Sequence, residues 1–245
     1  ENSQISIGNL HAENSQMSVK GDLNVSGRME FYGGTFSADA LQVKADKEAF
    51  QIIRFCDGAK AEVKEFSSDG VVILDINTSD YDISKGQGAD VAIQQIALSN
   101  ESEIQLEKGS LHSDTVNLDK EAQLFANNGT KAEIQKMTMD NGSRLDVGSY
   151  DDDDMVVKEA ADVTVHQLDL KGNSTITIEN GKLNSDQITM DKSTIDIAGV
   201  GTLIANKMTL NNTTLSLSGI QNEGTTLALD ADEDIQPLDV TQNGV

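Results

Sequence analysis

The chain has 245 residues, and its 41 Asp and Glu against 18 Lys and Arg give a formal net charge of −23. This charge argues against nucleic acid, whose binding requires basic side chains on the phosphates, and against docking on an anionic membrane. The single cysteine, Cys56, cannot form an intrachain disulfide or a CxxC metal motif. No apolar run approaches the ~20 residues that span a bilayer, so we expect no membrane insertion by this segment.

Short segments of alternating apolar and polar residues recur along the whole chain. This period of two is typical of half-buried strands. The clearest segments, in chain order, are residues 5–7, 23–25, 168–170, 175–178, 194–197 and 214–217. Turn-forming pairs separate them, as at Asn128-Gly129, Asn141-Gly142 and Asn180-Gly181. The sequence predicts an all-β protein, although high charge with few aromatic residues would otherwise suggest disorder.

A long internal repeat carries most of the information. Residues 89–120 align with residues 161–192 without a gap, and 14 of the 32 aligned positions are identical. Equivalent apolar positions recur at nearly constant spacing, at Leu23, Ile96, Leu168 and Leu238. The large repeat is therefore about 72 residues long.

Each large repeat contains smaller units of about 20 residues. Ile96, Val116 and Met137 follow this spacing, and it recurs in the next copy at Leu168, Ile188 and Met208. The step from one copy to the next, as from Met137 to Leu168, is longer by about half. The additional residues fall in the segments 81–88, 150–159 and 219–230. Regular coils with insertions gathered at one edge are typical of a solenoid.

These periods predict a right-handed parallel β-helix with coils of about 20 residues. The near absence of proline fits, because proline cannot donate to a strand ladder. A β-propeller is the alternative fold, but its blades need about 40 residues and a repeated aromatic pattern. We expect one β-helix domain over residues 1–245, forming part of a longer array. Its repeat copies are expected at about 21–88, 89–160 and 161–230, with a fourth starting at 231.

The chain resembles the passenger domains of bacterial autotransporters and related type V secreted adhesins. The likeness rests on serial Asn, Asp and Gly turns with apolar-x-apolar strands, as in residues 180–183 and 207–219, and on the acidity and scarcity of cysteine. The resemblance implies export from a Gram-negative cell, a β-helix displayed at the cell surface, and adhesion or self-association. Neither a C-terminal translocator barrel nor GGxxP-type repeats are visible in this sequence.

Recurring carboxylates are the first candidates for chemistry. An active site is built once, so a carboxylate present in every copy is better explained as a turn or strand-end residue. The three arginines and three histidines occupy non-equivalent positions, and no common catalytic motif is present. We therefore predict that the chain is not an enzyme. The recurring carboxylates are Asp39, Asp114 and Asp186, and Asp46, Asp119 and Asp191.

Four consecutive aspartates, Asp151, Asp152, Asp153 and Asp154, form the sharpest local feature. Adjacent carboxylates repel one another, and Ca²⁺, which takes 6–8 oxygen ligands, would relieve the repulsion. No EF-hand or β-roll calcium spacing accompanies them. A solvated acidic loop is the alternative, and apart from this Ca²⁺ site we expect no cofactor.

The first functional hypothesis is a non-catalytic adhesin or structural solenoid segment, exported to the bacterial cell surface. Its partner would be a host or bacterial surface protein, a glycan or a second copy of itself. The first alternative is a polysaccharide-active β-helix lyase or hydrolase, which requires a cleft with carboxylates and a base. The second alternative is a passive stalk that presents a distal domain.

Overall fold

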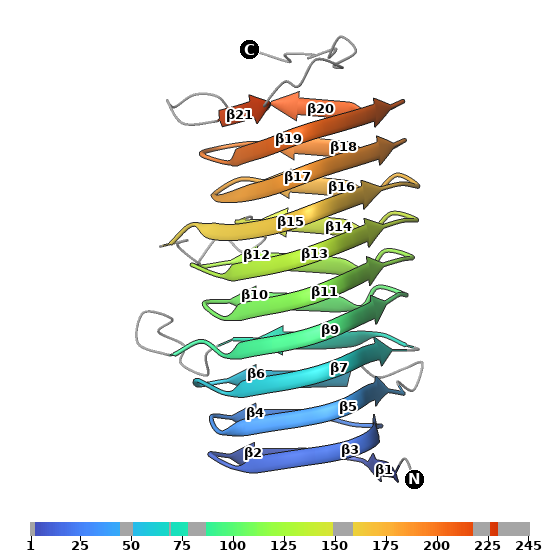
Figure 1. Ribbon diagram of the computed structural model, residues 1–245, viewed down its shortest axis with the longest axis vertical. Helices are drawn as coiled ribbons and strands as arrows, with labels where there is room; N and C mark the ends of the chain where they lie inside the picture. The colour runs from blue at the N-terminus through green and yellow to red at the C-terminus, as the bar shows by residue number, and fades with distance from the viewer. Residues whose placement is uncertain are drawn as a thin grey trace.

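The chain winds into a parallel β-solenoid with turns of about 20 residues. The computed structural model describes residues 3–44, 51–68, 70–77, 87–148, 159–217 and 226–229. Within these ranges every regular element is a β-strand, and the strands stack in two sheets along one axis (Figure 1). Every strand pairs in parallel with the strand one coil above or below it. The all-β parallel architecture predicted from the sequence is confirmed.

Between the first and the last strand, short and long strands alternate along the chain, and each kind forms its own sheet. The first and last strands are short and pair at the two ends of the long-strand sheet. The long-strand sheet contains β1 (Ser3–Ile7), β3 (Gln16–Val25), β5 (Thr35–Val43), β7 (Lys60–Ser68), β9 (Asp90–Leu98), β11 (Ser110–Leu118), β13 (Lys131–Met139), β15 (Ala161–Leu170), β17 (Gly181–Asp191), β19 (Thr202–Asn211) and β21 (Thr226–Leu229). The short-strand sheet contains β2 (Leu10–Glu13), β4 (Met29–Tyr32), β6 (Gln51–Cys56), β8 (Val72–Ile76), β10 (Glu103–Glu107), β12 (Gln123–Asn127), β14 (Arg144–Val147), β16 (Thr175–Ile178), β18 (Thr194–Ile197) and β20 (Thr214–Leu217).

The core is built from columns of inward side chains, one from each coil. The regularly spaced apolar positions lie on one column, because the register pairs Ile96 with Val116, Val116 with Met137, and Met137 with Leu168. These side chains are essentially inaccessible to solvent. Each buried aliphatic side chain of this size stabilises the fold by about 1.5–3 kcal/mol. The predicted period of about 20 residues is thus the number of residues along the chain between side chains that stack in successive coils.

Aromatic residues fill the core near the N-terminal end. The Phe36 ring lies 5.5 Å from Phe31 and 5.6 Å from Phe55, measured between ring centroids. All three rings are tilted against one another, the arrangement that aromatic pairs favour over face-to-face stacking. Further along the array the columns contain aliphatic residues and methionine.

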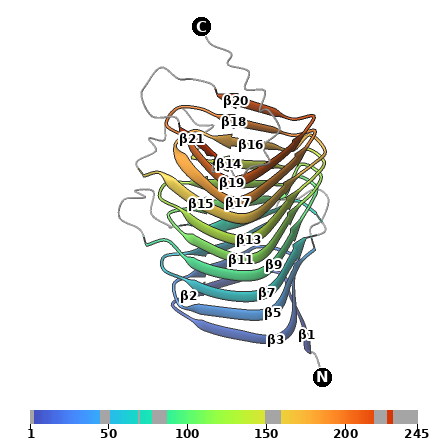
Figure 2. The same ribbon diagram turned by 45° about the horizontal axis from the view of Figure 1, so that its top comes forward.

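The long strands from β3 to β19 bend around the core near their middle (Figure 2). At the bend two consecutive side chains point outward, as Gln94 and Gln95 do in β9 and Lys64 and Glu65 do in β7. The register skips one position there, between Ala38/Val63 and Ala40/Glu65 for example. The bend therefore turns one strand into two faces of the solenoid without a loop.

The predicted turn pairs have two different outcomes. Asn128-Gly129 and Asn141-Gly142 adopt positive φ at both residues, as an Asn-Gly turn requires. At Asn180-Gly181 the prediction holds in part, because Asn180 lies in the bend between β16 and β17, whereas Gly181 is the first residue of β17 and is buried. A Cβ at Gly181 would lie 2.7 Å from Val147 Cγ1, so this glycine serves close packing between coils.

Candidate binding surface along the long strands

A row of polar side chains follows the bends of the long strands from coil to coil. We call it the corner row: Asp39, Lys64, Gln94, Asp114, Gln135, His166, Asp186 and Asn206. Asp39, Asp114 and Asp186 were predicted to be turn or strand-end residues, and the structure corrects this. They lie inside long strands, where the bend directs two side chains outward in succession and an apolar residue would be left in water. Asp119 and Asp191 do lie at strand ends.

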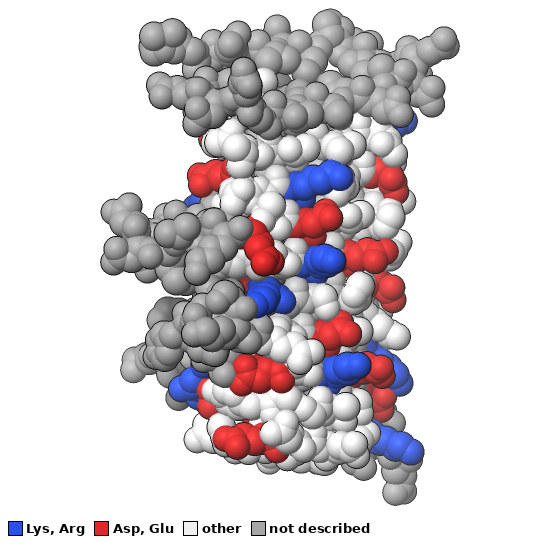
Figure 3. All heavy atoms as spheres, turned by 90° about the vertical axis from the view of Figure 1, so that its left-hand side faces the viewer, with Lys and Arg blue, Asp and Glu red and all other residues white. Residues whose placement is uncertain are grey.

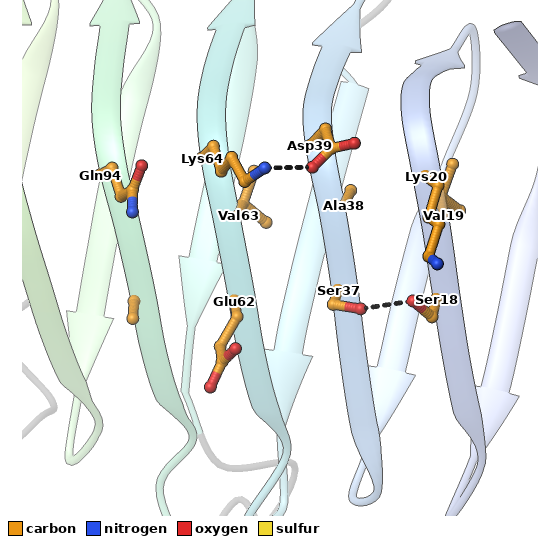
Figure 4. A pocket seen from close by; sticks show the side chains of 11 residues that line it. Ser18, Val19, Lys20, Ser37, Ala38, Asp39, Glu62, Val63, Lys64 and Gln94 are labelled. Carbon is orange, nitrogen blue, oxygen red and sulfur yellow. Dashed lines mark hydrogen bonds and ion pairs between the residues drawn. The ribbon is translucent and has the colours of Figure 1, made fainter. Parts of the chain in front are cut away.

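A second outward row runs beside the corner row, and the space between them is hollowed. We call it the outer row: Ser18, Ser37, Glu62, Ala92, His112 and Glu133, which the register pairs in sequence. One hollow of about 390 Å³ extends from β3 to β9 (Figure 4). Another of about 270 Å³ extends from β9 to β13, and both are lined by Ala92 and Gln94. The two hollows therefore adjoin at β9 and follow one another in the direction in which the strands stack, and we call the pair the groove.

The N-terminal part of the groove is held together by contacts between coils. Asp39 accepts a hydrogen bond from the Gly21 backbone N–H at 2.8 Å and pairs with Lys64 Nζ at 2.6 Å. Both contacts lower the pKa of Asp39 below its ordinary value, and the contact with Lys64 has the larger effect. The Ser37 hydroxyl donates to Ser18 Oγ at 2.9 Å. Figure 4 shows these side chains side by side on adjacent strands, with Glu62 on the strand of Lys64 and Gln94 on the next long strand.

Two histidines and two carboxylates form the C-terminal part of this surface. His166 Nδ1 lies 2.6 Å from Asp186 Oδ2, and its Nε2 lies 3.9 Å from Glu133 Oε1. His112 Nδ1 lies 3.7 Å from Glu133 Oε2 on the other side. The side chains are 36% to 61% exposed, so these are solvated strand residues, as predicted for both histidines. In the part of the chain that the structure describes, no group of three or more His, Cys, Asp or Glu is placed to hold a metal ion.

The opposite, short-strand sheet bears an ion-pair ladder. Glu30 lies 2.6 Å from Arg28 and 3.5 Å from Arg54, and Arg54 Nε lies 2.6 Å from Asp75 Oδ2. Burial alone would raise the pKa of Glu30, but Arg28, with hydrogen bonds from Tyr32 and His11, lowers it. Arg54 thus neutralises carboxylates on the strands to either side, and Arg28 neutralises Glu30 two residues further along its own coil. This role did not follow from their non-equivalent positions in the repeats.

Cys56 lies at the end of β6 and is inaccessible to solvent. Burial raises the pKa of its thiol to about 12, with a smaller contribution from the charge of Asp57. Because the thiolate is the reactive form, this cysteine is chemically inert in the folded chain at neutral pH.

Several residues singled out from the sequence lie outside the described ranges. These are Asp46 and the four aspartates of the proposed calcium site, Asp151, Asp152, Asp153 and Asp154. Most of the three inserted segments lies outside these ranges as well. The calcium hypothesis for the aspartate run therefore stays a prediction.

Charges of both signs are spread over the side of the molecule shown in Figure 3, over the residues drawn in colour. Among the large apolar residues whose side chains the structure describes, Ile5 and Val200 are the exposed ones. The described residues contain no helix that is long and apolar enough to cross a membrane. Comparisons with protein-family models, curated proteins and solved structures gave no significant match.

Proposed function

We propose that the chain is a non-catalytic adhesive segment of an exported, surface-displayed solenoid, and that it binds a hydroxyl-rich polymer such as a glycan along the groove. The observation that carries this proposal is that the two hollows adjoin at Ala92 and Gln94 and together extend from β3 to β13. Each coil from β3 to β13 contributes outward side chains to these hollows, which suits a ligand that is itself an extended chain.

The chemistry of the lining supports a polar ligand. Hydroxyls of Ser18 and Ser37, the amide of Gln94 and the carboxylate of Glu62 offer both donors and acceptors to sugar hydroxyls. Lys64 and Asp39 neutralise each other, so the first hollow does not select for a strongly charged polymer. An apolar peptide would leave these groups without hydrogen bonds and is disfavoured.

Ala92 provides a direct test because it lines both hollows. Ala92→Phe places a large side chain in the groove, at an outward position of β9. Ala97→Phe is the matched control, since Ala97 is also outward and exposed on β9 but lies beyond the bend. In a glycan-array experiment we expect Ala92→Phe to weaken binding at least about tenfold, which corresponds to ~1.4 kcal/mol. Ala97→Phe should bind like the unmodified chain.

Other outcomes would favour the other hypotheses. The passive-stalk hypothesis would be favoured if the chain bound no glycan and its mass in sedimentation stayed that of a monomer as the concentration rose. Concentration-dependent dimers abolished by Ala92→Phe would assign the groove to self-association. New reducing or unsaturated ends on a bound glycan would favour the polysaccharide-active enzyme.

A further inference from the structure

Asp75 is the least exposed carboxylate of the ion-pair ladder, and only one of its oxygens is paired within the described residues. Its side chain is 3% exposed, and Arg54 of the preceding coil contacts Oδ2 at 2.6 Å. Oδ1 is buried without a hydrogen-bond partner. A buried carboxylate oxygen without a partner is costly, so it calls for a ligand.

The strand on the other side of Asp75 supplies further oxygen atoms. The register pairs Asp75 with Gln105 of β10, and Glu107 lies two residues further on the same outward face. The Gln105 amide nitrogen donates to Glu103 Oε2 at 2.7 Å, which leaves Gln105 Oε1 as an acceptor. Asp75 and Glu107 are therefore diagonal neighbours on adjacent strands, close enough for their side chains to meet.

The environment of Glu107 disfavours the charged form of its carboxyl group. Its pKa is raised mainly by burial and further by the charge of Asp75, whereas a hydrogen bond from Asn77 lowers it. Along this ladder Glu30, Asp75, Glu103 and Glu107 carry four negative charges, and Arg28 and Arg54 carry two positive charges.

The next large repeat contains a modified version of the same arrangement. Asp146, Thr177 and Glu179 occupy the positions of Asp75, Gln105 and Glu107. There Arg144 Nε lies 2.8 Å from Asp146 Oδ1 and 2.6 Å from Oδ2, so an arginine reaches both oxygens. The two carboxylates recur in this copy, but Thr177 replaces Gln105, so the amide oxygen is missing. In addition, Arg144 contacts Asp146 from the same strand, β14.

We propose that Asp75, Gln105 and Glu107 form a binding site for a hard divalent cation, with Ca²⁺ as the ion that fits. Asp75 Oδ1, Gln105 Oε1 and the Glu107 carboxylate supply the oxygen ligands that Ca²⁺ prefers, and water completes the 6–8 positions. Ca²⁺ tolerates such an irregular ligand set, whereas Mg²⁺ demands near-octahedral geometry. The site lies on the short-strand sheet, so it is independent of the groove and of the function proposed for it.

Isothermal titration of the whole chain with CaCl₂ in physiological salt tests the site. We expect one site with a dissociation constant on the order of 10⁻⁴–10⁻³ M, the range of extracellular calcium modules, and weaker binding of MgCl₂. Glu107→Gln should weaken Ca²⁺ binding at least about tenfold, because ligand charge sets affinity. Glu179→Gln is the matched control: it makes the same charge change at the equivalent position and should alter the affinity less than about twofold.

A variant with the substitutions D151N, D152N, D153N and D154N separates this site from the acidic run. Retained binding in that variant, lost on adding Glu107→Gln, supports the proposal. The proposal is overturned if millimolar CaCl₂ gives no binding, or if Glu107→Gln binds like the unmodified chain with an unchanged circular dichroism spectrum. It is also overturned if the four-aspartate variant alone abolishes binding.

Discussion

At Gly148 two neighbouring coils approach so closely that a methyl group has no room. The residue has φ 73°, and a Cβ there would lie 2.1 Å from the carbonyl oxygen of Asn180. Gly142 also has positive φ, at 80°, but its nearest neighbour would be Glu121 Cγ at 3.5 Å. The two glycines share the same backbone requirement and differ in the space around them.

This difference predicts unequal costs for the same substitution. Gly142→Ala should lower the free energy of unfolding by about 1–2 kcal/mol, the cost of a left-handed non-glycine residue. Gly148→Ala adds a backbone clash and should cost about 1–3 kcal/mol more. Urea denaturation of both variants measures the difference. Equal losses would show that the coils separate at Gly148 with little resistance.

Glu107 predicts an unusual pH dependence. Burial raises its pKa in the folded chain above the unfolded value, so the protonated form favours folding. The stability that protonated Glu107 contributes is fully present below the unfolded pKa, near 4.5, and is lost as the pH rises through the raised pKa of the folded chain. Without Ca²⁺, Glu107→Gln should therefore unfold at higher urea than the unmodified chain at pH 7, and the difference should vanish near pH 4. A destabilised variant at pH 7 would contradict this.

Among the elements, the strands and the inward columns could be predicted from the sequence, and the bends could not. The columns follow from a fixed spacing of apolar residues, such as Ile96, Val116 and Met137, which parallel in-register stacking requires. At a bend the alternation breaks, because Gln94 and Gln95 both point outward. In the sequence such a pair resembles the end of a strand, so the pattern predicts shorter pieces in place of each long strand.

The two candidate sites depend on register between coils, which the sequence reveals only in part. The groove required knowing that Ser37, Glu62 and Ala92 are neighbours, although they come from three successive long strands with a short strand between each two. Asp75 and Gln105 are likewise paired across an entire coil and its inserted segment. The recurrence of Glu107 as Glu179 was visible in the aligned repeats, but nothing in one strand shows which carboxylate of the preceding coil lies beside it.

For the whole molecule, the large repeat should behave as a removable unit. Solenoid stability is close to a sum over coils and their contacts with immediate neighbours. Deleting residues 89–160 joins Gly88 to Ala161, the counterpart of Ala89, and would place β15 against β7 in the position of β9. The shortened chain should keep the same circular dichroism signal per residue. An unfolded product would show that the copies are not interchangeable.

The hydrogen bonds that join the coils run along the axis of the solenoid, and this direction determines how the rod responds to force. A pull applied between its ends acts along these bonds and opens the terminal coil before the others, since each coil is held only by its neighbours. A freed coil of about 20 residues can extend by up to ~70 Å where it contributed ~4.8 Å of height. Under tension such a rod lengthens coil by coil, so it absorbs a sudden load gradually instead of transmitting it at once.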